Sequence, residues 1–94
     1  MNSKKRIFVV DDEEDLTDLL QFQLKREGFK VETANDPFVA LSVARDYGPD
    51  LIVLDIMMPD RSGYDVCRSI RSTHPDIPII FISAKSEEID EVVG

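Results

Sequence analysis

The stretch LIVLDIMMPDRSG, residues 51–63, places a charge at the end of an apolar run. Its first four residues are all apolar, Asp55 follows them, and a loop containing Pro59 comes next. A short run that is apolar on successive residues is typical of a parallel strand covered by helices on both faces. We therefore predict a buried strand at 51–54 that ends at a carboxylate.

Three other short runs resemble this one in length and in their content of β-branched residues. They are RIFVV (6–10), KVETA (30–34) and IPIIFIS (77–83). The first and third are apolar on successive residues, which again predicts central strands. The second alternates polar and apolar residues, as an edge strand does.

Each predicted strand is followed by a segment with helical periodicity. The first helix follows Asp12 and ends at Gly28, a typical C-cap residue. The second begins at Asp36-Pro37, an N-cap followed by proline, and stops at 48–49. Val66 and Ile70 mark a third helix, and a fourth is predicted from Ser86 onward. This βα alternation predicts an open parallel α/β sheet with ligands at the carboxyl ends of its strands.

Length and composition restrict the class of protein. Ninety-four residues predict one domain, 1–94. The net charge of −8 argues against binding a nucleic acid through this domain. The single cysteine fits a reducing compartment, and no apolar run reaches the roughly 18 residues that a membrane span needs. With no recognisable signal peptide either, we expect a cytoplasmic protein.

Polar residues gather at the ends of three predicted strands: Asp11 and Asp12 after the first, Asp55 after the third and Ser83 after the fourth. If these strands are neighbours, three carboxylates and a hydroxyl share one small site. Close carboxylates repel one another, and a hard cation such as Mg²⁺ relieves the repulsion. Asp55 could then act as a nucleophile that becomes an aspartyl phosphate. Taken singly, Asp11 and Asp12 could equally be helix caps, and Ser83 a turn residue.

The segments FVVDDEEDL, PDLIVLDIMMPDRSG and PIIFISAKSEE, with GFKVETANDPFVAL between them, cover nearly the whole chain. Together they resemble the receiver domain of two-component response regulators, and SAKSEEIDEVVG is most similar to regulators with a winged-helix DNA-binding domain. The resemblance implies a flavodoxin-like sheet with strand order 2-1-3-4-5.

The resemblance also implies a role for each site residue. Asp55 would accept a phosphoryl group from the phosphohistidine of a sensor histidine kinase. Asp12 and Asp55 would bind Mg²⁺ directly, together with the backbone carbonyl of Met57, and Asp11 would act through water. Ser83 would be the switch hydroxyl.

The chain departs from the family pattern at its end. Receivers have a fifth strand, a lysine after it and a fifth helix, whereas this sequence stops at Gly94. We therefore expect a truncated receiver of order 2-1-3-4 that lacks the fifth βα unit. Its fourth strand would be a bare apolar edge, and the sheet face that the fifth helix covers in the family would also be bare and apolar. This predicts a homodimer or a domain-swapped pair in which the neighbour lies against the fourth strand or against the uncovered face.

Other functions remain open from the sequence. The chain could be an association fragment that is not phosphorylated. It could also be a Mg²⁺-dependent phosphohydrolase with an aspartyl nucleophile, although such an enzyme would want an acid where Met57 stands. A nucleotide-binding domain is disfavoured because no glycine-rich loop follows a strand. We expect a phosphoacceptor regulator and not an enzyme.

Overall fold

The computed structural model describes residues 4–58, 62–82 and 89–92. These residues form one five-stranded sheet of order β2-β1-β3-β4-β5. The first four strands are parallel, as the sequence predicted, and the order 2-1-3-4 is that of the flavodoxin-like fold. The strands are β1 (Arg6–Val10), β2 (Lys30–Ala34), β3 (Leu51–Asp55), β4 (Ile79–Ile82) and β5 (Ile89–Val92).

Three α-helices connect the parallel strands: α1 (Glu14–Arg26), α2 (Ala40–Tyr47) and α3 (Gly63–Thr73). A short 3-10 helix, η1 (Pro37–Val39), leads into α2, and the Asp36 side chain accepts a hydrogen bond from the Phe38 backbone N–H over 2.9 Å. Gly48 ends α2 with φ of 66°, a left-handed conformation that glycine adopts without steric cost. These start and stop residues were all readable in the sequence.

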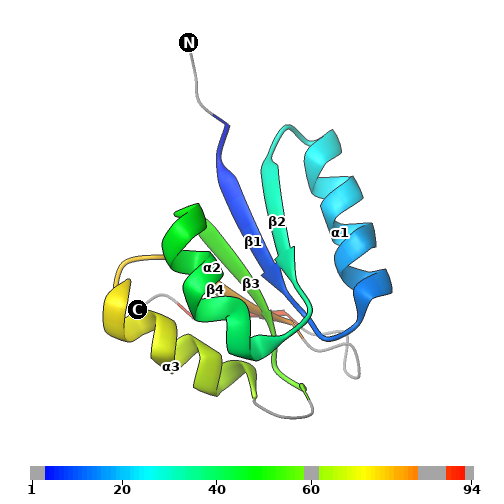
Figure 1. The fold of residues 1–94 in the computed structure, drawn as a ribbon. Coiled ribbons are helices and arrows are strands. Elements are labelled where there is room, and N and C mark those ends of the chain that lie inside the picture. The colour runs from blue at the N-terminus through cyan, green and yellow to red at the C-terminus, as the bar shows by residue number, and fades with distance from the viewer. Residues whose placement is uncertain (1–3, 59–61, 83–88, 93–94) are drawn as a thin grey trace.

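The helices cover the two faces of the sheet unequally (Figure 1). Helix α1 lies on one face, whereas α2 and α3 lie together on the other. The α2 and α3 face holds the larger apolar core, in which Phe8, Ile52 and Ile70 are fully buried. The α1 face has a smaller core around Ile7 and Val9.

The fourth predicted helix is wrong. Residues 89–92 form β5, which pairs antiparallel with β4 in the register Ile79↔Val92 and Ile82↔Ile89. The predicted bare edge on β4 is wrong for the same reason, because β5 satisfies its backbone groups. The helical spacing of Leu16, Leu19, Leu20 and Leu24, and of Phe38, Leu41 and Ala44, would place each set on one inner face, but Leu19 and Phe38 are 51% and 61% exposed.

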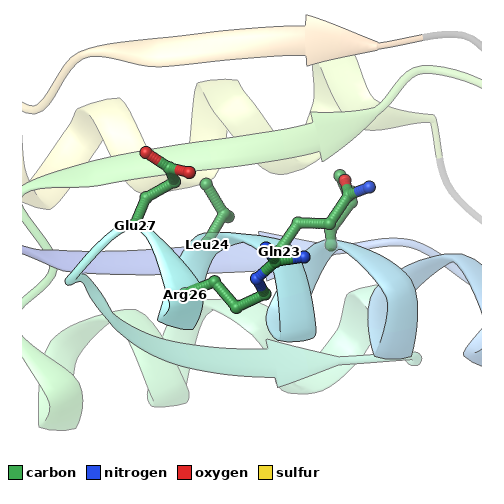
Figure 2. A pocket seen from close by; sticks show the side chains of 5 residues that line it. Gln23, Leu24, Arg26 and Glu27 are labelled. Carbon is green, nitrogen blue, oxygen red and sulfur yellow. The ribbon is translucent and has the colours of Figure 1, made fainter.

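Part of the sheet on the α1 side has no helix over it among the described residues. Leu51, Val53, Ile80 and Ile82 are only half-buried there. Figure 2 shows α1 in front of β1, with β2 on one side of it and β3 and then β4 on the other, and it shows the side chains that line a pocket along α1. The pocket is lined by Leu20, Gln23, Leu24, Arg26 and Glu27 of α1 and the turn after it.

Candidate functional site: an acidic cluster at the sheet edge

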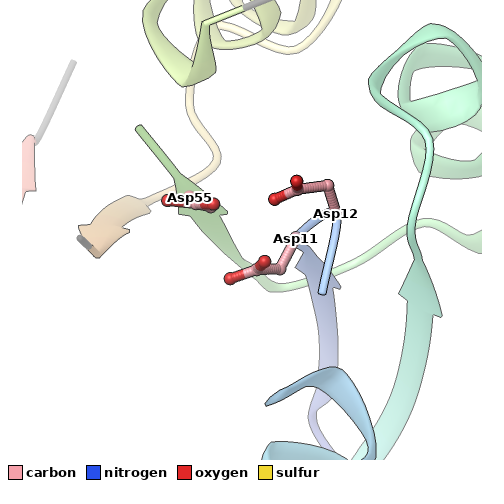
Figure 3. A group of neighbouring side chains, drawn as sticks. All are labelled: Asp11, Asp12 and Asp55. Atoms are coloured by element: carbon pink, nitrogen blue, oxygen red, sulfur yellow. The ribbon is translucent and has the colours of Figure 1, made fainter. Parts of the chain in front are cut away.

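The parallel pairing of β1 with β3 brings three carboxylates together. Val10 pairs with Leu54, so the residues that follow them, Asp11 and Asp55, emerge side by side at the carboxyl edge of the sheet. One carboxylate oxygen each from Asp11, Asp12 and Asp55 lies within 4.8 Å of the others. Figure 3 shows the three side chains converging from the ends of β1 and β3. The predicted shared acidic pocket is thus confirmed.

The two carboxylate oxygens of Asp11 lie in different surroundings. Its Oδ1 accepts a hydrogen bond from the Glu13 backbone N–H over 2.9 Å, which supports the start of α1. Its Oδ2 is buried and has no hydrogen-bond partner. A buried carboxylate oxygen without a donor is costly, so this atom is poised for a ligand that the protein itself does not supply.

Asp55 is held by the loop that follows it. Only 4% of the residue is exposed, and Oδ1 accepts a hydrogen bond from the Met57 backbone N–H over 3.0 Å. Met58 is buried and anchors the loop, whereas the Met57 side chain is 53% exposed. The role predicted for the Met57 carbonyl stays a prediction.

The cluster is electrostatically unfavourable by itself. The pKa of the Asp11 carboxyl is raised to about 7, mainly by burial; the hydrogen bond from the Glu13 N–H lowers it, and the charges of Asp55 and Asp12 add to the rise. Burial also raises the pKa of Asp55, and the charge of Asp12 adds to the shift. A divalent cation among these oxygens would favour the ionised carboxylates and remove the repulsion.

Hydrogen bonds from Asn35, at the end of β2, support the acidic cluster and were not predicted from the sequence. We call Asn35 and its two acceptors, the Asp11 carbonyl and the Thr17 hydroxyl, the Asn35 clamp. The Asn35 side-chain amide Nδ2 donates hydrogen bonds of 2.9 Å to the Asp11 backbone carbonyl and of 2.9 Å to the Thr17 hydroxyl. Thr17 is buried and its hydroxyl donates to the Glu14 carbonyl over 2.9 Å. The end of β2, the end of β1 and the first turn of α1 are thereby joined. An isolated Asn after a predicted strand gave no signal of this role.

Ser83, the predicted switch hydroxyl, lies outside the described residues. Its assignment stays a prediction. The structure brings together the three predicted acids and does not test the hydroxyl.

The fold and the site define a flavodoxin-like α/β protein with an acidic cluster at the carboxyl edge of its sheet. The family model of the response regulator receiver domain matches residues 7–93. The chain belongs to the response regulator receiver domain family.

Two curated relatives are transcriptional regulators. The chain is 48% identical over 90 residues to the alkaline phosphatase synthesis transcriptional regulatory protein PhoP of Bacillus subtilis. It is 37% identical over 91 residues to the transcriptional regulatory protein CreB of Escherichia coli. These alignments cover 96% and 97% of this chain but only 38% and 40% of the relatives, so the chain spans about two fifths of their length.

A solved relative gives the same fold. The response regulator protein TrrA of Thermotoga maritima, in complex with Mg²⁺-BeF, is 41% identical and superposes with a TM-score of 0.81 over 87% of this chain and 71% of that one. TrrA has also been solved in complex with the histidine kinase ThkA, and that structure matches with a TM-score of 0.80 over the same shares of the two chains.

Among the described residues, no helix has both the length and the hydropathy that crossing a bilayer requires.

Proposed function

We propose that this chain is the phosphoacceptor module of a two-component signalling system and that Asp55 is the acceptor. The observation that carries the proposal is the convergence of Asp11, Asp12 and Asp55, whose oxygens lie within 4.8 Å of one another around a buried, unpartnered oxygen. Membership of the receiver family supports it.

The donor set fits Mg²⁺. All the candidate ligands are carboxylate oxygens, the preferred ligands of this hard cation, and Asp11 has a buried oxygen, Oδ2, without a hydrogen-bond partner. Asp12 and Asp55 would hold Mg²⁺ directly with the Met57 carbonyl, and Asp11 through water. The bound cation would neutralise charge on the transferring phosphoryl group. The Mg²⁺-BeF complex of TrrA supports this assignment.

Asp55 is suited to nucleophilic attack by its position. The Met57 N–H fixes one carboxylate oxygen at 3.0 Å, which orients the side chain toward the other two acids. A carboxylate oxygen attacks phosphorus, the phosphorus–nitrogen bond of a phosphohistidine breaks, and its electron pair returns to the imidazole. The Ser83 hydroxyl would donate a hydrogen bond to a phosphoryl oxygen of the product.

The partner that supplies the phosphoryl group is proposed to be a sensor histidine kinase. The complex of TrrA with ThkA supports this class of partner. The similarity to the transcriptional regulatory proteins PhoP and CreB supports transcription regulation as the output of the pathway. The cytoplasm is proposed as the location from the sequence, which has a single cysteine and no recognisable signal peptide. The protein is proposed to act as a regulator that is phosphorylated and not as an enzyme that turns over phosphate esters.

Intact-mass measurement after incubation with acetyl phosphate and Mg²⁺ tests the acceptor. We expect a gain of one phosphoryl group in the parent and none in Asp55→Asn. Asp46→Asn is the matched control, because Asp46 is an exposed acid in α2 and should leave the gain intact. No gain in the parent, or an undiminished gain in Asp55→Asn, would contradict the proposal. Sustained hydrolysis of a phosphate ester would instead favour a phosphohydrolase.

A further inference from the structure

The first residue of α3 lies directly against the backbone of Asp55. Gly63 is buried, and a Cβ atom at this position would lie 2.2 Å from the Asp55 carbonyl oxygen and 2.9 Å from its carbonyl carbon. It would also lie 3.0 Å from the Ile56 Cα. All three atoms belong to the backbone, so no flexible side chain can move aside to make room.

Gly63 fits against the Asp55 backbone because it has no side chain, and not because its backbone conformation is one that only glycine adopts. The described glycines with positive φ are Gly28 and Gly48, at 98° and 66°. Gly63 instead begins a regular helix, whose first turn Ser62 caps by accepting a hydrogen bond from the Asp65 N–H over 3.2 Å. A side chain at position 63 would therefore be excluded by contact alone.

The backbone that Gly63 contacts is fixed from both sides. The Gly63 N–H donates to the Ile56 carbonyl over 3.0 Å, while the Ile56 N–H donates to the Ile82 carbonyl of β4 over 2.9 Å. The next N–H, that of Met57, holds the Asp55 carboxylate. A displacement of the Asp55–Ile56 peptide would therefore move both the Asp55 side chain and the donor that orients it.

We propose that Gly63 is a positioning residue for Asp55: the missing side chain lets α3 seat against the Asp55 carbonyl, and this contact sets the distance of the Asp55 carboxylate from Asp11 and Asp12. The inference rests on the proposed function because a cation at the acidic cluster is its most direct readout. Gly63 touches no reacting atom and acts only through Asp55.

The test compares two glycine substitutions that destabilise the protein for different reasons. Gly63→Ala forces a backbone contact beside Asp55. Gly48→Ala strains a left-handed C-cap at the end of α2, where a Cβ would meet nothing closer than the Arg6 Nη1 at 3.7 Å. Mg²⁺ is titrated into each protein at a temperature at which circular dichroism shows it to be folded, and the amide resonances of Asp11, Asp12 and Asp55 report binding.

We expect Gly63→Ala to raise the Kd for Mg²⁺ about tenfold or more, as loss of a residue supporting metal ligands does. Gly48→Ala should lower the unfolding temperature but leave the Kd within about twofold of the parent, because its strain is remote from the cluster. In the cation-free proteins, the amide resonances of Asp55 and Met57 should move in Gly63→Ala and stay in place in Gly48→Ala.

Equal affinities in Gly63→Ala and the parent would overturn the inference and leave the proposed function standing. Absence of Mg²⁺ binding in the parent would count against the proposed function, and the cation-free resonances would then decide the inference alone. If Gly63→Ala does not fold, the titration and the amide spectra are repeated for all three proteins in a stabilising osmolyte such as trimethylamine N-oxide, which favours the folded state. An unchanged Kd and unmoved Asp55 and Met57 resonances in Gly63→Ala under these conditions would overturn the inference.

Discussion

At Asp11, one carboxylate oxygen supports the start of α1 and the other is buried without a partner. In cation-free protein the raised pKa of this carboxyl means that the folded state retains a proton up to about pH 7. The unfolded chain releases that proton near the ordinary value of 3.8. Stability from this group is therefore fully present below about pH 3.8 and is lost as the pH rises through about 7.

Asp11→Asn should consequently stabilise the cation-free protein at high pH. Asn cannot ionise, and it keeps an oxygen that accepts the Glu13 N–H. We expect a gain of roughly 1–3 kcal/mol in the free energy of unfolding at pH 8 and a smaller gain at pH 5. Urea unfolding in the presence of a chelator measures both values. A gain that does not change between the two pH values would contradict the explanation.

Mg²⁺ should reduce the stability advantage of Asp11→Asn over the parent at pH 8. A cation that binds only the folded parent adds about 2.7 kcal/mol when its concentration is a hundred times the Kd. Asp11→Asn has one negative charge fewer in the cluster, so Mg²⁺ should add less to its free energy of unfolding. Equal gains in both proteins would show that Asp11 takes no part in cation binding.

The three acids were predictable because each follows a strand whose apolar pattern is visible in the sequence. Parallel pairing of these strands then brings the three side chains together at one edge of the sheet. Gly63 and Asn35 were not predictable in this way. A glycine or an asparagine in a loop is compatible with many turns, and its role depends on contacts with backbone from other segments: Asp55 for Gly63, Asp11 for Asn35.

At the scale of elements, the Asn35 clamp joins β2, β1 and α1. Asn35→Ala would leave the Asp11 carbonyl without this donor and remove a hydrogen bond to the Thr17 hydroxyl. We expect a loss of about 1 kcal/mol in the free energy of unfolding, typical of one or two hydrogen bonds at a partly exposed side chain. Chemical denaturation measures it.

Thr17→Val is the partner variant for this prediction. It keeps the buried shape and removes the hydroxyl that accepts from Asn35. Because the two residues share a hydrogen bond, the double variant should lose less stability than the sum of the single losses. Strict additivity would show that the clamp does not act as a unit.

The pairing of elements also explains why the fourth predicted helix was wrong. Ile89, Val92 and Val93 have a spacing that fits a helix face, and glutamates after Ser86 fit a helix start. The segment is short, however, and a short apolar pattern does not distinguish helix from strand. Pairing with β4 provides backbone hydrogen bonds from another element, which local periodicity cannot reveal.

At the scale of the whole molecule, the residues that the structure describes leave part of the sheet face beside α1 uncovered. Val53 pairs with Ile80, and both side chains are half-buried on the same side of the sheet, with Leu51 and Ile82 along the same strip. Burial of such apolar surface contributes about 25 cal/mol per Å². The strip, and not the β4 edge, is therefore the surface on which association would be most favourable.

The predicted homodimer accordingly keeps only one of its two expected contacts, the uncovered face of the sheet. The outer strand is now β5, which pairs with β4 along the register Ile79↔Val92 to Ile82↔Ile89, so the β4 edge is not free to pair with another chain. We expect two copies of the 94-residue chain to associate through the strip and not through their sheet edges.

Light scattering across the micromolar range should show a dimer, and Val53→Lys should convert it to a monomer because a charge cannot be buried there without a partner. Phe22→Lys is the matched control, since Phe22 is 61% exposed on α1 and lies outside the strip. A parent that stays monomeric and unfolds cooperatively throughout that range would refute the dimer, and a dimer that survives Val53→Lys would place its contact elsewhere.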